Sequence, residues 1–350
     1  MKVELFDYLL PADRIAQTAR PRGTSRLLVL NRTDGSIRHR SFSDFPELLR
    51  EGDVLVRNDV RVRPARLWGR DEQDRVVEIF LLEDAAGDSR RWTALAKPGR
   101  RAKAGREVRF AEGVSARVEA VQDDGRREVL FDREMDDALL ERIGNVPLPP
   151  YIRREAGVPD RPEDRIAYQT VFAREPRAVA APTAGLHFTP EVLERIERRG
   201  VTIADLTLSI GAATFKPVTV EETAQHRLDA ENAEIPAATV REVSRARAEG
   251  RRVVATGTTA TRALEAAARL PGGFDGTGDL SFAANVFITP GFEFRAVDAL
   301  LTNFHLPRST LLMLVCAFAG REKVLAAYDE AIREGYLFYS YGDAMFIADF

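Results

Sequence analysis

The sequence predicts an α/β protein with a mostly parallel sheet and flanking helices, into which an all-β, barrel-like domain is inserted. Two observations support this fold class. From residue 61 to about residue 132, short extended runs alternate with Gly and Asp turns, and no helical stretch interrupts them. From residue 178 onward, strands and helices alternate, as in a parallel sheet covered by helices. We therefore expect residues 61–149 to form a domain inserted into a discontinuous one, made of 1–60 and 150–350.

Length and composition narrow the class of protein. The chain has 350 residues, of which 45% are hydrophobic and 30% charged, which is ordinary for a globular protein with room for two domains. The apolar run 311–319 is far shorter than the ~20 residues that cross a bilayer, and residues 1–17 lack the apolar core of a signal peptide. We expect a cytoplasmic protein without membrane contact. The single cysteine, Cys316, excludes intrachain disulfides and thiolate metal clusters.

In the first half of the chain, the sequence pattern predicts mainly strands. "RLLVLNRTDGSIRHRSF" predicts a hairpin that turns at Asp34-Gly35, and "GDVLVRN" predicts one more strand. In the inserted domain, runs such as "VVEIFLLE", "RWTALA" and "SARVEAV" alternate with period two and indicate about six strands. "MDDALLERIG" then predicts a helix, and the three prolines of "NVPLPPYIRR" predict a linker.

The second half alternates between strands and helices. "AVAAP" predicts a strand, after which Thr189 is an expected N-cap, Pro190 the first helical residue and "EVLERIERR" a helix that ends at Gly200. "VTIADLTL" and "RRVVAT" predict strands. Helices are predicted by "PAATVREVSRARAEG", "ATRALEAAARL", "STLLMLVCAFAG" (capped by Ser309 or Thr310) and "REKVLAAYDEAIREG". The final "YLFYSYGDAMFI" predicts a half-buried strand after a turn.

Three loops are expected to meet at the carboxyl edge of this sheet, where α/β proteins bind ligands. In "VVATGTTATRALEAA", Gly257, Thr258 and Thr259 join a buried strand to a helix, so N–H groups and two hydroxyls gather at the positive end of a helix dipole. That arrangement suits an anion, although a plain helix cap explains it equally well. "AAPTAGLHFTPE" and "TNFHLPRSTLLML" are the other two loops, and a shared pocket is the simplest interpretation.

Three of the four histidines, His187, His226 and His305, lie in or near these polar loops. A neutral imidazole can accept or donate a proton, but a lone histidine is more often a hydrogen-bonded structural residue. Three imidazoles can also hold zinc. Because the sequence has no H-x-H, H-x-x-x-H or H-E-x-x-H spacing, we expect no metal.

Charge gives no global signal for nucleic acid, since the net charge is −3. Arginines nevertheless cluster locally, in 61–66 and in "KPGRRAKAGR". Such a cluster is either a solvated surface or a loop that contacts RNA. Near the C-terminus, Tyr339 and Tyr341 offer aromatic faces for a flat base or a sulfonium cation, or they belong to the final strand.

Beyond these patterns, six motifs carry a resemblance: "LPPYI", "YQTVFA", "AVAAPTAGLHF", "GTTATRALE", "DALLTNFHLPRSTLLMLV" and "YSYGDAMFI". They resemble the S-adenosylmethionine:tRNA ribosyltransferase-isomerase family, the QueA type, of queuosine biosynthesis. The resemblance implies transfer and isomerisation of the ribosyl moiety of S-adenosylmethionine onto 7-aminomethyl-7-deazaguanine at the wobble position of tRNA. Epoxyqueuosine forms, and adenine and methionine are released. S-adenosylmethionine is consumed as a substrate, so no cofactor is implied, and we expect a monomer whose partners are this compound and the tRNA.

The implied chemistry assigns roles to the candidate residues. The sulfonium acidifies the C5′ proton, so the site needs a base, a donor for the leaving adenine and a seat for the methionine carboxylate. His187 and His305 are the acid and base candidates, and Glu231 and Asp343 are either alternative bases or partners of the substrate ammonium. The expected binding residues are Thr183, Gly185, Phe188, Thr214, His226, Gly257, Thr258, Thr259, Arg262, Asn303, Tyr339 and Tyr341. Residues 257–259, with Arg262 nearby, are expected to seat the carboxylate or a phosphate, and Phe188, Tyr339 and Tyr341 to stack a base.

The chain departs from the family pattern at Ser209, Ala213, Asp229 and Thr289, where histidine, glycine, histidine and tyrosine are usual. No role of those side chains is carried over. Two other functions stay open at this point. One is a non-catalytic tRNA-binding module that uses the arginines of the β domain, and the other is a metal-dependent hydrolase that uses the three histidines.

Overall fold

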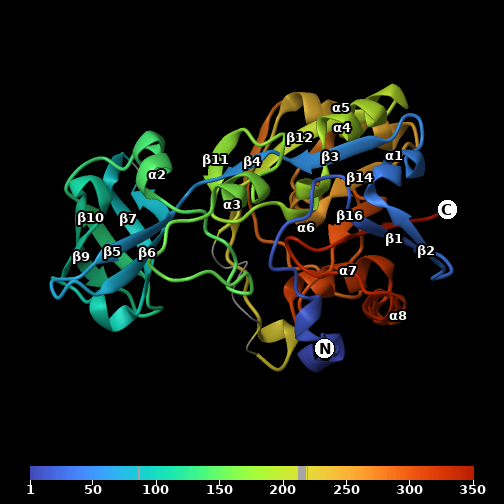
Figure 1. Ribbon diagram of the computed structural model, residues 1–350. Coiled ribbons are helices and arrows are strands. Elements are labelled where there is room, and N and C mark those ends of the chain that lie inside the picture. Colours follow the sequence, from blue (N-terminus) through green and yellow to red (C-terminus); the bar gives the residue numbers. More distant parts are fainter. Residues whose placement is uncertain (86, 212–217, 219) are drawn as a thin grey trace. The chain divides into compact units, whose positions relative to one another are not determined.

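The computed structural model describes residues 1–85, 87–211, 218 and 220–350 and divides the chain into two compact units. Unit 1 consists of Met1–Val60, Thr170–Glu175 and Ala181–Phe350, and unit 2 of Arg61–Gln169 and Pro176–Ala180. Unit 1 contains an α/β sheet and unit 2 a closed β-barrel (Figure 1). The predicted fold class, α/β with an additional barrel, is confirmed.

The sheet of unit 1 has nine strands in the order β15-β13-β12-β3-β14-β16-β17-β1-β2. Their bounds are β1 Arg26–Asn31, β2 Ile37–Ser41, β3 Val54–Asn58, β12 Thr202–Leu208, β13 Glu231–Ile235, β14 Val253–Thr256, β15 Leu280–Ala284, β16 Ala299–Asn303 and β17 Ala344–Ala348. Strands β12, β3, β14 and β16 run parallel to one another. β13 and β17 pair antiparallel with β12 and β16, so the sheet is mixed and its parallel part is central.

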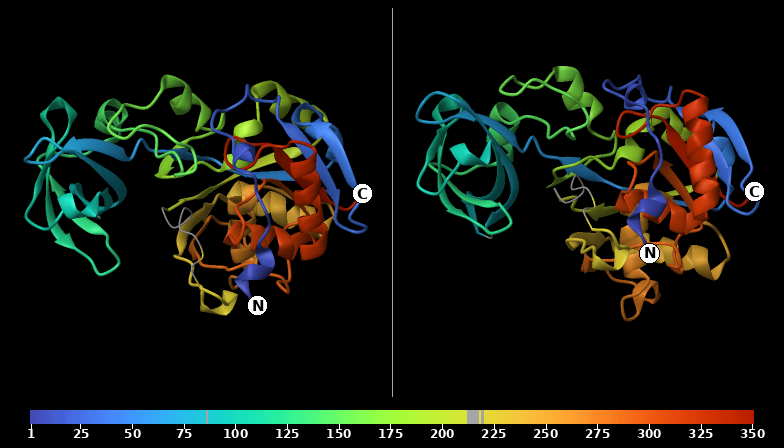
Figure 2. Two further views of the ribbon diagram at one scale, coloured as in Figure 1. Left: turned by 60° about the horizontal axis from the view of Figure 1, so that its bottom comes forward. Right: turned by 90° about the horizontal axis from the view of Figure 1, so that it is seen from below.

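Helices cover both faces of this sheet (Figure 2). They are α1 Phe45–Leu48, α4 Pro190–Arg198, α5 Ala237–Ala248, α6 Gly257–Ala267, α7 Thr310–Ala319 and α8 Arg321–Arg333. Both predicted N-caps are present, because Oγ1 of Thr189 accepts from N of Val192 and Oγ of Ser309 accepts from N of Leu312, each at 3.2 Å. None of the helices in the described ranges is long and apolar enough to cross a membrane.

The apolar core explains which helix covers which face. Val254 of β14 and Leu301 of β16 belong to one buried cluster with Phe45 of α1 and Ile196 of α4. On the other face, α5 and α6 pack on β3, β12 and β14. Alternate residues of each central strand point to opposite faces of the sheet. Because helices cover both faces, nearly all of these residues are buried, and the sequence of each strand is an apolar run.

One predicted strand is wrong, and five strands were not predicted. The extended segment before "AVAAP" is β11 (Glu175–Ala178), which pairs with β4 (Val60–Val62) in a separate two-stranded sheet. Residues 179–181 are not a strand, because alanines bury little surface in a sheet and the following Pro182 cannot donate a ladder hydrogen bond. Besides β4 and β11, the unpredicted strands are β13, β15 and β16, with the runs "ENAEI", "LSFAA" and "ALLTN". These runs are not enriched in β-branched residues, and only β15 follows a clear turn signal, the Gly- and Asp-rich segment 276–279.

Unit 2 contains a closed antiparallel barrel of six strands in the order β10-β7-β6-β5-β8-β9. Their bounds are β5 Arg66–Arg70, β6 Val76–Ala85, β7 Asp88–Lys97, β8 Glu107–Arg109, β9 Ser115–Val121 and β10 Arg127–Phe131. Closure leaves the barrel without an open strand edge. The unit also contains the predicted helix, α2 (Asp137–Ile143), and an unpredicted one, α3 (Pro162–Ala167).

The strand directions gather many loops at one edge of the nine-stranded sheet. The parallel strands β12, β3, β14 and β16 all end there. β13 and β17 begin there, because Leu208 pairs with Ala233 and Asn303 with Ala344. β1 also begins at this edge, since it is parallel to β17. The predicted site residues must therefore be sought at this carboxyl edge.

Candidate active site

The three loops expected to form a pocket meet at this edge. "TAGLH" forms a short 3₁₀ helix, η6 (Thr183–His187), which packs against both β16 and the start of α6. Cβ of Ala184 lies 3.4 Å from the position that a Cβ on Gly257 would occupy. Gly257 has φ = +86°, a conformation that glycine adopts without strain. His305, in the third loop, follows β16 by two residues.

His187 presents a buried imidazole nitrogen at this edge. Its side chain ends η6, the residue is 4% exposed, and Nδ1 lies 2.9 Å from Oγ of Ser25. Neither Nε2 nor Oδ1 of the nearby Asn303 makes a hydrogen bond of good geometry among the described residues, but the Asn303 side chain is close enough to act on the imidazole as a hydrogen-bond partner. Burial lowers the pKa of His187 to about 4, although the Asn303 amide opposes this shift. The imidazole is therefore neutral at pH 7.

Asn303 connects the end of β16 to the loop before β17. Its Nδ2 donates to the backbone O of Tyr339 at 2.9 Å. Tyr339 has φ = +70°, a left-handed conformation that costs roughly 1–2 kcal/mol for a residue with a side chain. The Asn303 amide and a hydrogen bond of 3.1 Å from N of Tyr339 to O of Phe304 hold this turn. Tyr339 and Tyr341 are each 5% exposed.

His305 is fixed by contacts on several sides. Its Nε2 lies 2.8 Å from Oγ1 of Thr302, and its backbone N donates to the hydroxyl of Tyr328 at 3.0 Å. The hydroxyl of Tyr8 donates to its carbonyl. Burial lowers the pKa of His305 to about 3, so this imidazole is also neutral at pH 7.

Arg262 and Glu231 form a buried ion pair beside these loops. Nη1 of Arg262 lies 2.7 Å from Oε2 of Glu231, and the two side chains are 11% and 8% exposed. Burial raises the pKa of Glu231, while the charge of Arg262 opposes that shift. Nε and Nη2 of Arg262 are buried and have no hydrogen-bond partner in the part of the chain that the structure describes. These two N–H groups form the edge of a guanidinium that binds a carboxylate through two parallel hydrogen bonds.

A pocket opens beside this ion pair. Asp229, Glu231 and Arg262 supply its charged wall, and the other lining residues come from 286–288 after β15, from α7 and from Leu228. The pocket thus offers a guanidinium edge, two carboxylates and apolar side chains. His226, half-buried nearby, lies with its ring 5.5 Å from that of Phe287. The charges and apolar side chains of this pocket are chemically complementary to a zwitterionic ligand with an apolar stem.

The pocket and the start of α6 lie on the same side of that helix. Thr258 and Arg262 are four residues apart, so their side chains share a face, and helical side chains lean towards the N-terminus. Oγ1 of Thr259 and Oγ1 of Thr256 are buried without a hydrogen-bond partner within the described ranges. An anion at this helix end would meet free N–H groups and these hydroxyls.

Other candidates are already engaged within the protein. Asp343 is fully buried and accepts hydrogen bonds of 2.8 Å from Nη1 of Arg20, N of Arg26 and N of Leu337. Phe188 is fully buried in the core, with rings of three other phenylalanines within 6.0 Å. A Cβ on Gly185 would lie 2.8 Å from the side chains of Phe172 and Thr170, so this glycine allows close packing of protein groups.

The remaining sequence candidates add little. Thr183 is half-buried at the start of η6. Thr214 and Ala213 lie outside the described residues. Of the other departures from the family pattern, Asp229 is exposed in the pocket, whereas Ser209 and Thr289 are half-buried. No three His, Cys, Asp or Glu side chains within the described ranges gather closely enough to hold a metal ion.

Sequence reasoning missed two residues at this edge. Asp59, directly after β3, is 7% exposed and accepts from Oγ1 of Thr207 at 2.7 Å, and burial raises its pKa. Its signal was an acidic residue immediately after the apolar run "VLVRN". Ser25 orients His187 from the segment before β1, and no sequence pattern connects two residues that lie 162 positions apart.

Comparisons with other proteins match almost the whole chain. A family model described as queuosine biosynthesis protein matches residues 3–347. S-adenosylmethionine:tRNA ribosyltransferase-isomerases from Moorella thermoacetica and Heliobacterium modesticaldum are 49% and 48% identical, over 99% of this chain and 100% of each relative. A solved structure, that of an S-adenosylmethionine tRNA ribosyltransferase from Thermotoga maritima, is similar with a TM-score of 0.55 and 38% identity, over 98% of this chain and 99% of that one.

Proposed function

The chain belongs to the queuosine biosynthesis protein family, and from this premise we propose how its residues perform the ribosyltransferase-isomerase reaction. In this reaction the ribosyl moiety of S-adenosylmethionine is transferred onto 7-aminomethyl-7-deazaguanine in tRNA and isomerised. Epoxyqueuosine is formed, and adenine and methionine leave. The full-length identity to S-adenosylmethionine:tRNA ribosyltransferase-isomerases supports this activity.

One observation supports the location of the site: buried polar atoms without partners gather at the carboxyl edge. They are Nε and Nη2 of Arg262, Nε2 of His187, Oδ1 of Asn303, and Oγ1 of Thr256 and Thr259. Roughly 90% or more of buried polar groups have a partner, and each one left without costs about 1–3 kcal/mol. A bound sulfonium nucleoside has a carboxylate, ribose hydroxyls and ring nitrogens with which to supply the missing partners.

Arg262 is the residue that we propose to bind the methionine carboxylate. Its Nε and Nη2 edge is available for a bidentate pair, because Glu231 occupies only Nη1. Glu231 thereby orients the guanidinium and adds a negative charge beside the ligand, where the substrate ammonium is favoured. The N–H groups at the start of α6 face the same side and add a positive field for the carboxylate or for a phosphate.

His187 is the proposed base. Because its pKa is lowered to about 4, its imidazole is neutral and carries a lone pair at pH 7, and Nε2 makes no hydrogen bond of good geometry among the described residues. In the proposed step the C5′–H bond breaks, its proton moves to Nε2, and the electron pair stays on the carbon beside the sulfonium. That pair forms a C4′=C5′ double bond as the C4′–O4′ bond breaks, and the electrons on O4′ form a carbonyl at C1′ as the C1′–N9 bond to adenine breaks. Asp343 is a weaker candidate, because three protein donors already occupy its carboxylate.

The test follows exchange at C5′. We expect purified protein with S-adenosylmethionine and precursor tRNA to release adenine and methionine, and His187→Gln to lose C5′ deuterium exchange while still binding S-adenosylmethionine. Binding of tRNA without any release of adenine would favour the non-catalytic module, and loss of turnover after chelator treatment would favour a metal-dependent enzyme. Normal exchange in His187→Gln would refute His187 as the base.

A further inference from the structure

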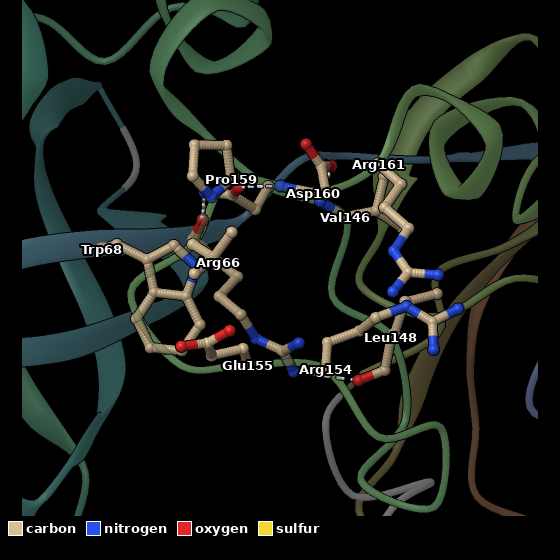
Figure 3. Close-up of a pocket in the computed structure, with 11 residues that line it drawn as sticks. Arg66, Trp68, Val146, Leu148, Arg154, Glu155, Pro159, Asp160 and Arg161 are labelled. Atoms are coloured by element: carbon tan, nitrogen blue, oxygen red, sulfur yellow. Dashed lines mark hydrogen bonds between the residues drawn. The ribbon is translucent and has the colours of Figure 1, made fainter.

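Unit 2 contains a pocket of its own, on the outside of the barrel (Figure 3). It lies between β5 and the segment 145–161, and its volume is about 560 Å³ including the open mouth. The part that is enclosed by protein is only about 120 Å³, smaller than the ~300–1,000 Å³ of a closed small-molecule site, so a ligand here would lie in an open groove. Trp68 and Glu155 lie towards one side of the pocket, and Arg154 and Arg161 towards the other.

Trp68 is an aromatic side chain on the outer face of a barrel strand. Along β5, Leu67 and Gly69 are buried inside the barrel, whereas Arg66, Trp68 and Arg70 alternate on the outside. Trp68 is half-buried, and its indole makes no ring contact or hydrogen bond with the described residues. A large aromatic face that is neither in the core nor stacked on another ring is available to a flat ligand.

The pocket rim is held by hydrogen bonds within the unit. N of Val146 donates to Oδ2 of Asp160 at 2.7 Å, and N of Asp160 donates back to Oδ1 of Asn145 at 2.8 Å. Arg165 binds the other oxygen of Asp160 at 2.9 Å. These contacts fix both ends of the segment 145–160, so the pocket is formed before any ligand binds.

Most charges around the pocket are already compensated. Arg66 lies 2.9 Å from Glu78 and donates to the carbonyl of Leu148, and Arg154 binds both oxygens of Asp164 at 2.7 and 2.8 Å. The lining charges for which the described residues offer no ion pair are Arg161 and Glu155, both exposed. The pocket therefore presents one cation, one anion and an indole face to a ligand.

We propose that this pocket binds one guanine nucleotide of the tRNA, other than the nucleotide that is modified. The base stacks on Trp68, its adjacent N1–H and N2–H groups donate to the Glu155 carboxylate, and Arg161 binds a phosphate. Guanine fits because it presents two neighbouring donors, whereas cytosine and adenine present one amino group beside an acceptor. This inference rests on tRNA being the substrate, as in the proposed function.

The test separates stacking, base recognition and phosphate binding. Trp68→Ala is expected to raise KM for tRNA about fivefold or more, in line with the usual contribution of a stacked base. The kcat and the KM for S-adenosylmethionine should not change. Trp68→Phe is expected to retain most of the affinity for tRNA. Arg161→Gln is expected to reduce the slope of log K against log[salt] by about 1. Glu155→Gln is expected to weaken tRNA binding. The matched control is Arg70→Gln, on the same outer face of β5 but not among the pocket-lining residues.

Fluorescence gives a readout that does not depend on turnover. The chain has two tryptophans, and Trp92 is 4% exposed with its Nε1 bonded to the carbonyl of Ser89 at 2.8 Å. Unmodified tRNA and guanosine monophosphate should therefore quench Trp68, and Trp68→Phe should remove the quenching. Unchanged tRNA KM in Trp68→Ala, with an active wild type and no quenching, would overturn this proposal. An inactive wild type whose Trp68 is quenched would instead overturn the proposed function alone.

Discussion

Replacing Arg262 by lysine tests the proposed carboxylate seat. Arg262→Lys keeps a cation beside Glu231, whose Oε2 is 2.7 Å from Nη1, but removes the Nε and Nη2 edge that has no partner among the described residues. A lysine ammonium cannot offer two parallel N–H groups to a carboxylate. Arg262→Ala is a poorer probe, because it would leave Glu231 buried without its partner and cost about 3–5 kcal/mol of folding stability.

The expected magnitude follows from the lost hydrogen bonds. Hydrogen bonds to charged groups contribute about 1.5–3 kcal/mol, which corresponds to roughly 10- to 150-fold weaker binding of S-adenosylmethionine. Titration calorimetry measures this change directly. Arg269→Lys is the matched control, since Arg269 pairs with Glu265 at 2.7 Å just beyond the same helix and does not line the pocket.

A decarboxylated substrate makes the test specific. Wild-type protein should bind decarboxylated S-adenosylmethionine about as weakly as Arg262→Lys binds the intact compound, and the variant should show little further loss with it. Such non-additivity is the signature of a direct interaction in a double-mutant cycle. If Arg262→Lys keeps its thermal stability but weakens both compounds equally, the carboxylate does not bind at Arg262 and the assignment is refuted.

Three further predictions concern the histidines, Asp343 and Gly185. Burial lowers the pKa of His187 from 6.5 to about 4 and that of His305 to about 3 in the folded protein, so the unfolded chain binds more protons below pH 6.5. The unfolding free energy should therefore fall as the pH drops from about 6.5 towards 4, by up to about 3 kcal/mol for His187. Urea unfolding at pH 7 and pH 5 measures this fall, and His305→Asn should make the unfolding free energy less dependent on pH. Asp343→Asn should lower the unfolding free energy by about 2–4 kcal/mol, because an amide cannot accept from all three donors that the carboxylate binds. At low temperature the variant should stay folded and retain C5′ exchange. Loss of exchange in a folded variant would make Asp343 the base. Gly185→Ala should destabilise by about 1–3 kcal/mol, because the new methyl would lie 2.8 Å from Phe172 and Thr170, and an unchanged melting temperature would contradict this packing argument.

The sequence predicted the barrel and most helices well, because both carry local signals. Period-two alternation with Gly and Asp turns identifies the strands of the barrel, and caps such as Thr189 and Ser309 mark helix starts. Strands β13 and β15 carry polar or small residues and are stabilised mainly by pairing with neighbours distant in sequence, which a local pattern cannot show. "AVAAP" was wrongly predicted to be a strand because its four apolar residues are typical of one, although the segment ends in a proline, which cannot donate a ladder hydrogen bond.

The candidate site was predictable in its parts but not in its connections. Residue type and loop position pointed to His187, His305 and Arg262. Their partners are set by tertiary contacts: Ser25 lies 162 residues before His187, and Glu231 lies 31 residues before Arg262. For the same reason, sequence alone could not distinguish Asp343, whose carboxylate receives three protein donors, from an acid available to a substrate.

The mixed sheet explains why one edge can hold so many polar groups. In an all-parallel sheet only strand ends and the following helix starts lie at the carboxyl edge. Here β13 and β17 run in the opposite direction, so their first residues and the loops before them reach the same edge as the ends of β14 and β16. Glu231 therefore comes to the start of α6 from one antiparallel strand, and the loop of Tyr339 reaches Asn303 from another. If β13 were parallel to β12, Glu231 would lie at the opposite edge, and the buried guanidinium of Arg262 would have no counter-ion in its strand neighbours.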